Sequence, residues 1–326
     1  MKKFAPVFNG LLLAAFILVA LSIGATHIDH FWSALVNPGV NEILWQIRMP
    51  RVLAAVLVGA SLGIAGLMAQ GACNNALAEP AILGTSAGAS LGAVAGILFG
   101  VVQVGSLGAI IFGVLGALGA TALTFKLASL RSNLSSFALI IVGIAVSASI
   151  TAIVGLATTM VTRSDARSIS FWNFGSLSLI TNSNLVGLFA ITLLGGFIAW
   201  KVAPSLDLLS LGDATAFHLG VDVRKARITA LIALSVLAGG AVSTVGTIAF
   251  LGLAAPHIAR FIYGPAHRFL IIQSGLIGAT LLVLADTAAR TMATPNELPI
   301  GLVTSLIGAP ILIALVAVRN TTWRTP

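Results

Sequence analysis

The stretch LLLAAFILVALSIGA, residues 11–25, contains no charged residue, and Leu276 to Ala285 is also nearly pure apolar. A membrane-crossing helix needs about 20 mostly apolar residues. Helices are expected because the backbone must satisfy its own hydrogen bonds in the hydrocarbon core. Of the 326 residues, 58% are hydrophobic and 8% are charged, with a mean hydropathy of +1.07. So few charges could not cover a water-soluble domain of this length, and the alternation typical of barrel strands is missing. The sequence therefore predicts an all-α polytopic membrane protein.

Polar, proline and charged clusters divide the chain into ten predicted spans. They cover residues 7–27, 50–73, 82–102, 107–127, 137–160, 185–203, 228–246, 248–263, 269–287 and 299–318. The eighth is too short to cross comfortably, so we expect it to be broken or partly re-entrant. A short extra helix is expected at Ile169 to Leu177. We treat residues 1–326 as one transmembrane domain.

The first span follows Met1-Lys2-Lys3, a start that would also suit a signal peptide. We favour an uncleaved helix because it makes the number of spans even. With both termini in the cytoplasm, twelve of the seventeen Lys and Arg residues fall inside, as the positive-inside rule expects. The five outside are Arg48, Arg51, Arg163, Arg167 and Arg290. The net charge of +8 therefore reflects topology in the cytoplasmic (inner) membrane, and no nucleic-acid partner is expected.

Several kinds of chemistry are not supported by the sequence. Cys73 is the single cysteine, which excludes an internal disulfide and a multi-cysteine metal site. His27, Asp29 and His30 could ligate a metal at the outer mouth, but three such residues on one short loop are weak evidence, and we predict no metal site. The chain has no Gly-Lys dipeptide, so it lacks a phosphate-binding loop and cannot hydrolyse ATP alone. With no spacing typical of a catalytic triad or carboxylate pair, we predict no catalytic residue and no cofactor.

The longest polar interruption is the segment 204–227. Gly212 and Gly220 divide it into two short amphipathic pieces. Such pieces suit docking into a groove of a soluble partner. The alternative is a solvated loop lying on the membrane lipid.

Glycines recur every fourth residue along the third predicted span, which places them on one helix face. They are Gly84, Gly88, Gly92, Gly96 and Gly100. Small residues let membrane helices approach closely, so we predict tight helix packing on this face. A narrow wall of a transport pathway is compatible with that packing.

Several motifs occur in a fixed order from the second span to the last. They are Arg48-Met49-Pro50-Arg51, residues 75–80, residues 83–89, Phe174-Gly175-Ser176-Leu177, residues 211–212 with 219–221, residues 246–253 leading into 256–260, and residues 286–290 with 297–301. In these motifs the chain resembles the FecCD-type permeases, the membrane subunits of ABC importers for ferric siderophores, haem and cobalamin. Ala76 departs from the pattern, since the family usually has proline there.

The resemblance implies a type II ABC importer permease with about ten helices per subunit. It implies a homodimer, or a heterodimer of close paralogues, with the translocation path on the two-fold axis. Two copies of a separate ATPase subunit would bind ATP and Mg, and an extracytoplasmic solute-binding protein would deliver the solute. The segment 204–227 would then couple the permease to the ATPase. Its coupling residues are Leu211, Gly212, Asp213, Ala216, Leu219, Gly220 and Val221.

The resemblance also assigns roles to polar residues near the span ends. Arg48, Arg51 and Arg290 would hold acidic residues of the binding protein, although Asp286 could instead pair with Arg290 four residues away. The gate on the cytoplasmic side would comprise Asn75, Leu77, Ser135 and Ser136. For the two serines, helix capping is the alternative. Apart from the resemblance, His257 and Arg260 follow Pro256 with no carboxylate neighbour to make the histidine a proton carrier, so we expect them to anchor the eighth span on the cytoplasmic side and to contact the ATPase.

Two functions compete at this stage. An ABC importer permease fits every motif, and we expect a ferric siderophore as its cargo, with haem or cobalamin as alternatives. An ion-coupled secondary transporter would need ionisable or unwound polar sites near the bilayer middle. Most spans here lack any charge, and Glu79 and Asp286 fall near span ends.

Overall fold

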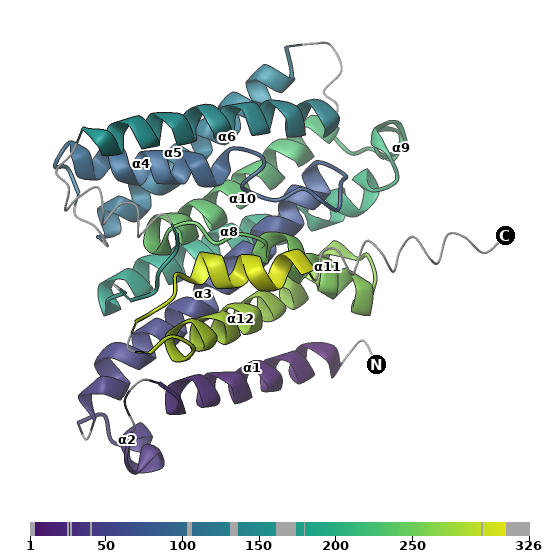
Figure 1. Cartoon of the computed structure of the whole chain (residues 1–326). Coiled ribbons are helices and arrows are strands. Elements are labelled where there is room, and N and C mark those ends of the chain that lie inside the picture. The colour runs from purple at the N-terminus through teal and green to yellow at the C-terminus, as the bar shows by residue number, and fades with distance from the viewer. Residues whose placement is uncertain are drawn as a thin grey trace.

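The computed structural model describes residues 4–24, 26, 28–39, 41–102, 106–130, 136–160, 174–178, 180–294 and 296–310. These residues form a bundle of helices, and no strand occurs among them (Figure 1). The helices are α1 (Ala5–Ser22), α2 (Phe31–Val36), the π-helical segment η2 (Ile43–Arg48), α3 (Met49–Ala72), α4 (Thr85–Leu98), α5 (Leu107–Ala128), α6 (Ser136–Thr159), α8 (Asn182–Leu209), α9 (Asp213–His218), α10 (Val223–Val245), α11 (Leu251–Tyr263), α12 (His267–Thr291) and a C-terminal helix, Ile300–Pro310.

Ten of these helices coincide with the ten predicted spans, so the predicted fold class is confirmed. Seven helices in the described part of the chain are long and apolar enough to cross a membrane. They are α1, η2 with α3, α5, α6, α8, α10 and α12. Three shorter helices, α4, α11 and Ile300–Pro310, match the remaining predicted spans.

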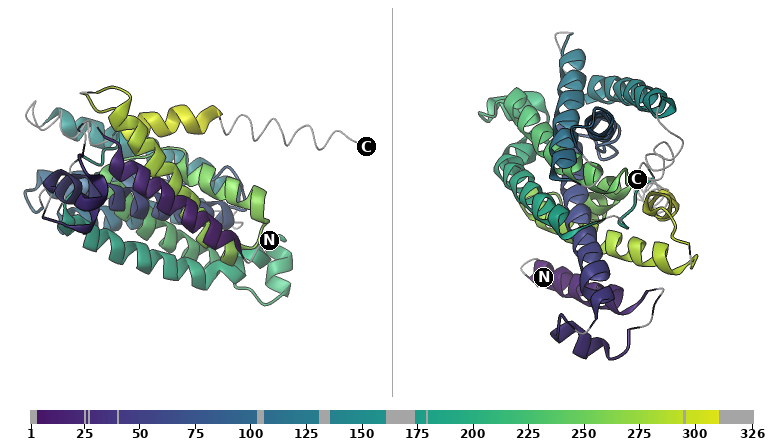
Figure 2. Two further views of the ribbon diagram at one scale, coloured as in Figure 1. Left: turned by 90° about the horizontal axis from the view of Figure 1, so that it is seen from below. Right: turned by 90° about the vertical axis from the view of Figure 1, so that its left-hand side faces the viewer.

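Helices α3 and α10 form the centre of the bundle. Nearly the whole of each helix is buried, and α3 packs against α8, α10, α11 and α12. By contrast, α1 and α6 bury only a few residues each. They lie on opposite sides of the bundle in Figure 1 and in the right-hand view of Figure 2. Their apolar outer faces are therefore available to lipid or to another subunit.

Close helix contacts depend on glycine, as the stripe in the third span predicted. A Cβ at Gly88 or Gly92 of α4 would collide with the α5 backbone at Gly116 or Phe112. The same constraint holds in the centre, where a Cβ at Gly66 of α3 would meet the carbonyl oxygen of Gly252 in α11. Backbone contact of this kind leaves no room for any side chain, so these positions require glycine.

Two local predictions need correction. The predicted helix at 169–177 lies mainly outside the described residues, and its described end, 174–177, forms a turn. Hydrogen bonds hold this turn to its neighbours, from Ser176 N–H to Val245 O and from Ile300 N–H to Gly175 O. The eighth span is short as expected, but α11 runs unbroken through Pro256.

Candidate functional site

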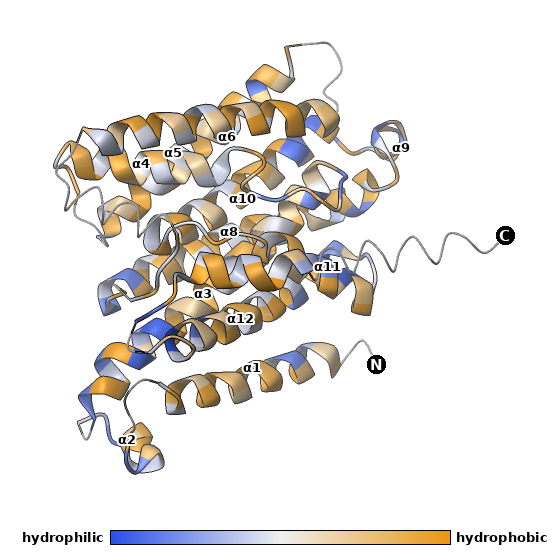
Figure 3. Cartoon of the chain, in the orientation of Figure 1, coloured by the Kyte–Doolittle hydropathy of each residue, from blue (hydrophilic) through white to orange (hydrophobic). Residues whose placement is uncertain are grey.

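The most hydrophilic stretches of the ribbon lie toward the two ends of the bundle, and the helices between them are largely hydrophobic (Figure 3). At one end, next to α2, lie the start of α3 and the end of α12. At the other lie α9, the end of α3 and the start of α1 (Figure 1). These two ends contain most of the predicted functional residues.

The first cluster centres on Arg51 of α3 and Asp286 of α12. Arg51 Nε donates to Asp286 Oδ1 at 2.9 Å, and Arg51 Nη1 donates to Glu297 Oε1 at 2.8 Å. Arg290 approaches Asp286 Oδ2 at 3.5 Å through its Nε atom, the pairing considered from the sequence. Asp286 is 1% exposed, whereas Glu297 keeps an exposed side chain. Two carboxylates thus share the charge of two guanidinium groups in a site that largely excludes water.

Arg48 joins this cluster through backbone carbonyls rather than carboxylates. Its guanidinium donates to Leu21 O at 2.8 Å and to Ser22 O at 3.1 Å, and it also reaches Thr26 O. Arg290 donates to Ala20 O. The end of α1 is therefore bound to α3 and α12 by two arginines.

The three arginines are less accessible than their predicted docking role suggests. Arg48, Arg51 and Arg290 are 4%, 6% and 6% exposed. The sequence placed Arg48 and Arg51 at the beginning of a span, but η2 extends the helix outward to Ile43 and so places both arginines inside it. Docking to a binding protein stays a prediction for these residues.

The second cluster surrounds the last turn of α3. Arg227 of α10 donates from Nε to Ala72 O at 3.1 Å, and Arg260 of α11 donates from Nη1 to Gln70 Oε1 at 2.9 Å. A Cβ built on Gly71 would lie 3.1 Å from His267 Nε2 of α12. Cations are favourable at a helix C-terminus because the carbonyl groups there carry partial negative charge. The sequence analysis singled out Arg260 as an anchor but missed Arg227, Gln70 and His267.

The turn after α3 contains Asn75 and Leu77, two of the four predicted gate residues. Asn75 Oδ1 accepts from Leu77 N–H at 2.9 Å, and Asn75 N–H donates to Gln70 O at 3.1 Å. Leu77 is 49% exposed, so it projects from the turn. Ser136 is the first residue of α6, and Ser135 lies outside the described residues. Cys73 is buried at the start of this turn, and burial raises the pKa of its thiol to about 12.

The predicted coupling residues form the short helix α9 and its two flanking turns. Gly212 has φ +100° and Gly220 has φ +86°, so both turns use backbone conformations that suit glycine. Ala216 is buried, while Leu211, Phe217 and Leu219 expose more than half of their side chains. Asp213 begins α9 and accepts from Arg227 Nη2 at 2.9 Å. An exposed apolar group therefore lies on a helix that an ion pair holds to the bundle.

The other residues singled out from the sequence are His257 and the group at residues 27–30. His257 is half-buried in α11 beside the buried Pro256. Asp29 and His30 are exposed next to α2, and His27 lies outside the described residues. Among the residues that the structure describes, no group of three His, Cys, Asp or Glu side chains could hold a metal.

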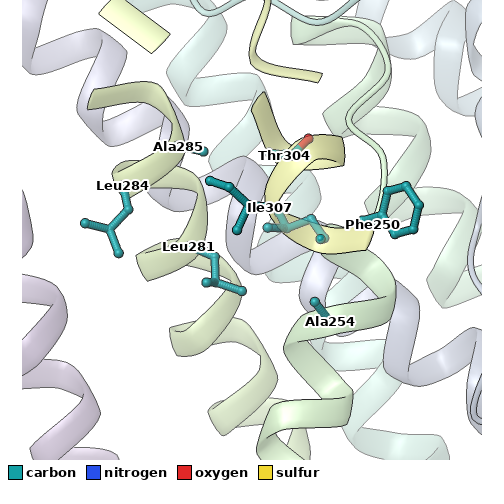
Figure 4. A pocket seen from close by; sticks show the side chains of 9 residues that line it. Phe250, Ala254, Leu281, Leu284, Ala285, Thr304 and Ile307 are labelled. Atoms are coloured by element: carbon teal, nitrogen blue, oxygen red, sulfur yellow. The ribbon is translucent and has the colours of Figure 1, made fainter. Parts of the chain in front are cut away.

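A cavity of about 110 Å³ lies between α11, α12 and the C-terminal helix. Phe250, Leu281, Leu284 and Ile307 line it (Figure 4). Its one polar side chain, Thr304, already donates to Gly301 O at 3.1 Å. The cavity offers no polar group to hold a charged solute.

Buried ionisable residues in the described chain belong to the two clusters at the helix ends. They are Arg48, Arg51, Arg227, His267, Asp286 and Arg290. None lies near the middle of a spanning helix, where an ion-coupled transporter would need its site.

Comparison with known proteins agrees with this geometry. The model of the FecCD transport family matches residues 11–318. The chain is 36% identical to the hemin transport system permease protein HmuU of Yersinia pestis, with 92% of each chain covered. It is 35% identical to the iron(3+)-hydroxamate import permease FhuB of Bacillus subtilis, covering 94% of this chain and 80% of that one. It is also 35% identical to the vitamin B12 import permease BtuC of Vibrio cholerae, covering 95% and 92%.

A solved metal-chelate-type ABC transporter in an inward-facing conformation has a TM-score of 0.85 and 31% identity, covering 97% of this chain and 99% of that one. The family match spans almost the whole chain, and the fold is similar to that of this transporter over nearly the full length of both chains. This chain is a multi-pass transport permease of the FecCD family.

Proposed function

We propose that this chain is the membrane subunit of an ABC importer that moves a ferric siderophore into the cytoplasm. The observation that carries the proposal is the family match over residues 11–318, together with relatives named as import permeases over nine-tenths of this chain. The absence of buried charge from the middle of the described spans favours this machine over an ion-coupled transporter.

The relatives identify the type of transporter more directly than they identify its cargo. The haem, hydroxamate and B12 permeases are 35–36% identical to this chain, so identity alone does not separate their solutes. Permeases named for iron uptake recur among the relatives, and the structural neighbour is of the metal-chelate type. These names favour a ferric siderophore, with haem as the second candidate because of HmuU.

The cytoplasmic partner in this proposal is a separate ATPase, docked on α9. Leu211, Phe217 and Leu219 present apolar surface on a segment otherwise made polar by Asp213 and Asp222. Burial of exposed apolar groups is the main driving force for protein association. Asn75 and Leu77, at the same end of the bundle, would form the gate that the ATPase controls.

The subunit is proposed to act as a homodimer, with a heterodimer of close paralogues as the alternative. Helix α6 supports a lateral contact because several of its large apolar residues, such as Ile144 and Leu156, are exposed. The tagged and the untagged chain would be expressed together, and the molecular mass of their assembly would be measured in lipid nanodiscs. This measurement distinguishes a homodimer from a heterodimer.

The extracytoplasmic partner is a solute-binding protein that meets the cluster of Arg48, Arg51 and Arg290. Charge-reversal of these arginines is a poor test, because the side chains are buried and bonded within the subunit. The salt dependence of binding-protein affinity needs no mutation. Affinity should fall as salt rises, since steering between unlike charges is screened. Affinity independent of salt would contradict docking through this cluster.

Uptake by the complete complex tests the proposed function. Proteoliposomes holding the permease, its ATPase and its binding protein would be offered ferric hydroxamate, haemin or cobalamin in parallel. We expect the ferric hydroxamate to accumulate only when ATP is present on the side of the membrane that carries the ATPase. A protonophore should not change this accumulation. Preference for haemin would establish the second cargo. Uptake driven by a proton or sodium gradient without the ATPase would overturn the importer proposal.

A further inference from the structure

Arg227 connects two parts of the molecule that are far apart in sequence. Its guanidinium donates from Nη2 to Asp213 Oδ1 of α9 at 2.9 Å and from Nε to Ala72 O, the last residue of α3, at 3.1 Å. The side chain is 3% exposed. One rigid, planar group therefore bonds the exposed helix α9 to the buried central helix in a fixed geometry.

The chain itself connects these elements only loosely. Helix α9 continues into α10 through residues 219–222, and Gly220 in that turn has φ +86°. Such a turn can absorb a displacement of α9 by small backbone rotations. The contact through Arg227 bypasses it, because Arg227 lies on the second turn of α10 and reaches Ala72 directly.

The receiving end of this contact is held firmly. Arg260 bonds Gln70, and Gln70 O accepts from Asn75 N–H at 3.1 Å. On the other side, the His267 ring lies against Gly71 and bonds Asp207 of α8 at 2.7 Å. The last turn of α3 is thus fastened to α8, α11 and α12, and the turn with Asn75 and Leu77 follows it immediately.

We propose that Arg227 is the positioning residue that passes a displacement of α9 to the turn at residues 73–78. This inference rests on the proposed function, in which α9 docks on the ATPase and that turn is the gate. Arg227 itself is too buried to touch the ATPase. Its role is to make α9 and the end of α3 move as one unit.

A merely structural role, capping the end of α3, is the competing explanation. Asp213→Asn separates the two, because it removes the charged partner on α9 and leaves the bond to Ala72 O in place. Arg227 stays charged in this variant, so its contact with α9 loses the ion pair and keeps at most a hydrogen bond to the neutral amide oxygen at position 213. Asp213→Asn should therefore keep the thermal stability and the co-purifying ATPase, while the solute imported per ATP hydrolysed falls about tenfold. Asp213→Glu should restore most of this ratio.

A double-mutant cycle excludes direct contact between Asp213 and the ATPase as the cause. If Asp213 acts through Arg227, the double variant Asp213→Asn with Arg227→Gln should transport no less per ATP than the worse single variant. Multiplied losses would overturn the proposal. Glu42→Gln, an exposed carboxylate at the opposite end of the bundle, serves as the control and should leave the ratio unchanged.

A second readout uses the purified permease without partners, so that it stands even if the proposed importer function fails. Amide hydrogen exchange at Asn75 and Ala78 should become faster in Asp213→Asn than in the unmodified chain, because the end of α3 has lost its link to α9. Unchanged exchange at both amides would overturn the link. A wild-type complex that imports nothing, with faster exchange in the variant, would overturn the importer function alone.

Discussion

The two ends of α3 are both surrounded by basic side chains, yet they are built differently. At the end next to α2, Arg51 bonds Asp286 and Glu297, and the cluster closes on itself within the bundle. At the end next to α9, Arg227 and Arg260 bond a backbone carbonyl and an amide side chain of α3. The carboxylate that pairs with Arg227 is Asp213, whose half-exposed side chain lies on the surface helix α9.

This difference indicates different mechanical roles. A buried ion pair whose partners both lie in spanning helices locks those helices together. A buried arginine whose carboxylate partner lies on a surface helix transmits a displacement of that helix to the interior of the bundle. The end next to α2 is therefore expected to determine stability, and the end next to α9 is expected to determine coupling.

The largest effect is expected from Asp286→Asn. Removing one partner of a buried pair leaves uncompensated charge, here on Arg51 and Arg290, and typically costs about 3–5 kcal/mol. We expect the permease to lose its folded state in detergent. The measurement is the temperature at which the folded peak disappears from a size-exclusion column after heating. Glu297→Gln is the matched control, because its exposed side chain should make the loss much smaller. Equal stability of the two variants would contradict the assignment of stability to this end.

The next largest effect concerns coupling alone. Gly220→Pro forces φ near −65° at a position with φ +86° and so distorts the turn between α9 and α10. The variant should insert and assemble with the ATPase, but import should collapse. Vesicle uptake and ATPase stoichiometry, measured on the same preparation, check this. Normal uptake at normal stoichiometry would show that residues 211–221 are a passive loop.

The smallest effect is a pH dependence near the turn at residues 73–78. Burial raises the pKa of Glu79, so the folded chain holds this proton more tightly than the unfolded chain does. Stability should therefore fall as pH rises from the unfolded pKa of Glu79 through its higher folded value. Glu79→Gln should remove this loss and stabilise the chain at neutral pH. A thermal midpoint with the same pH profile in both chains would contradict the assignment.

Helix positions followed from the sequence more reliably than side-chain contacts did. Hydrophobic length and proline positions were enough to locate all ten helices, because the bilayer constrains helix length so strongly. The burial of Arg48 was not predicted, because the span was taken to begin at Pro50, whereas η2 continues the helix outward to Ile43. Arg227 looked like any cytoplasmic charge, because its bonds to Ala72 and Asp213 depend on the packing of helices distant in sequence.

The docking of α9 on the ATPase is the central claim, and site-specific cross-linking tests it most directly. Phe217 is 70% exposed on α9, and the native Cys73 is buried and unreactive, so a Phe217→Cys variant carries one accessible thiol. Trp32, 68% exposed on α2, provides the matched position at the opposite end. We predict that Phe217→Cys cross-links to the co-purified ATPase and that Trp32→Cys does not. Cross-linking from position 32 but not from 217 would contradict both the docking of α9 and the orientation of the bundle.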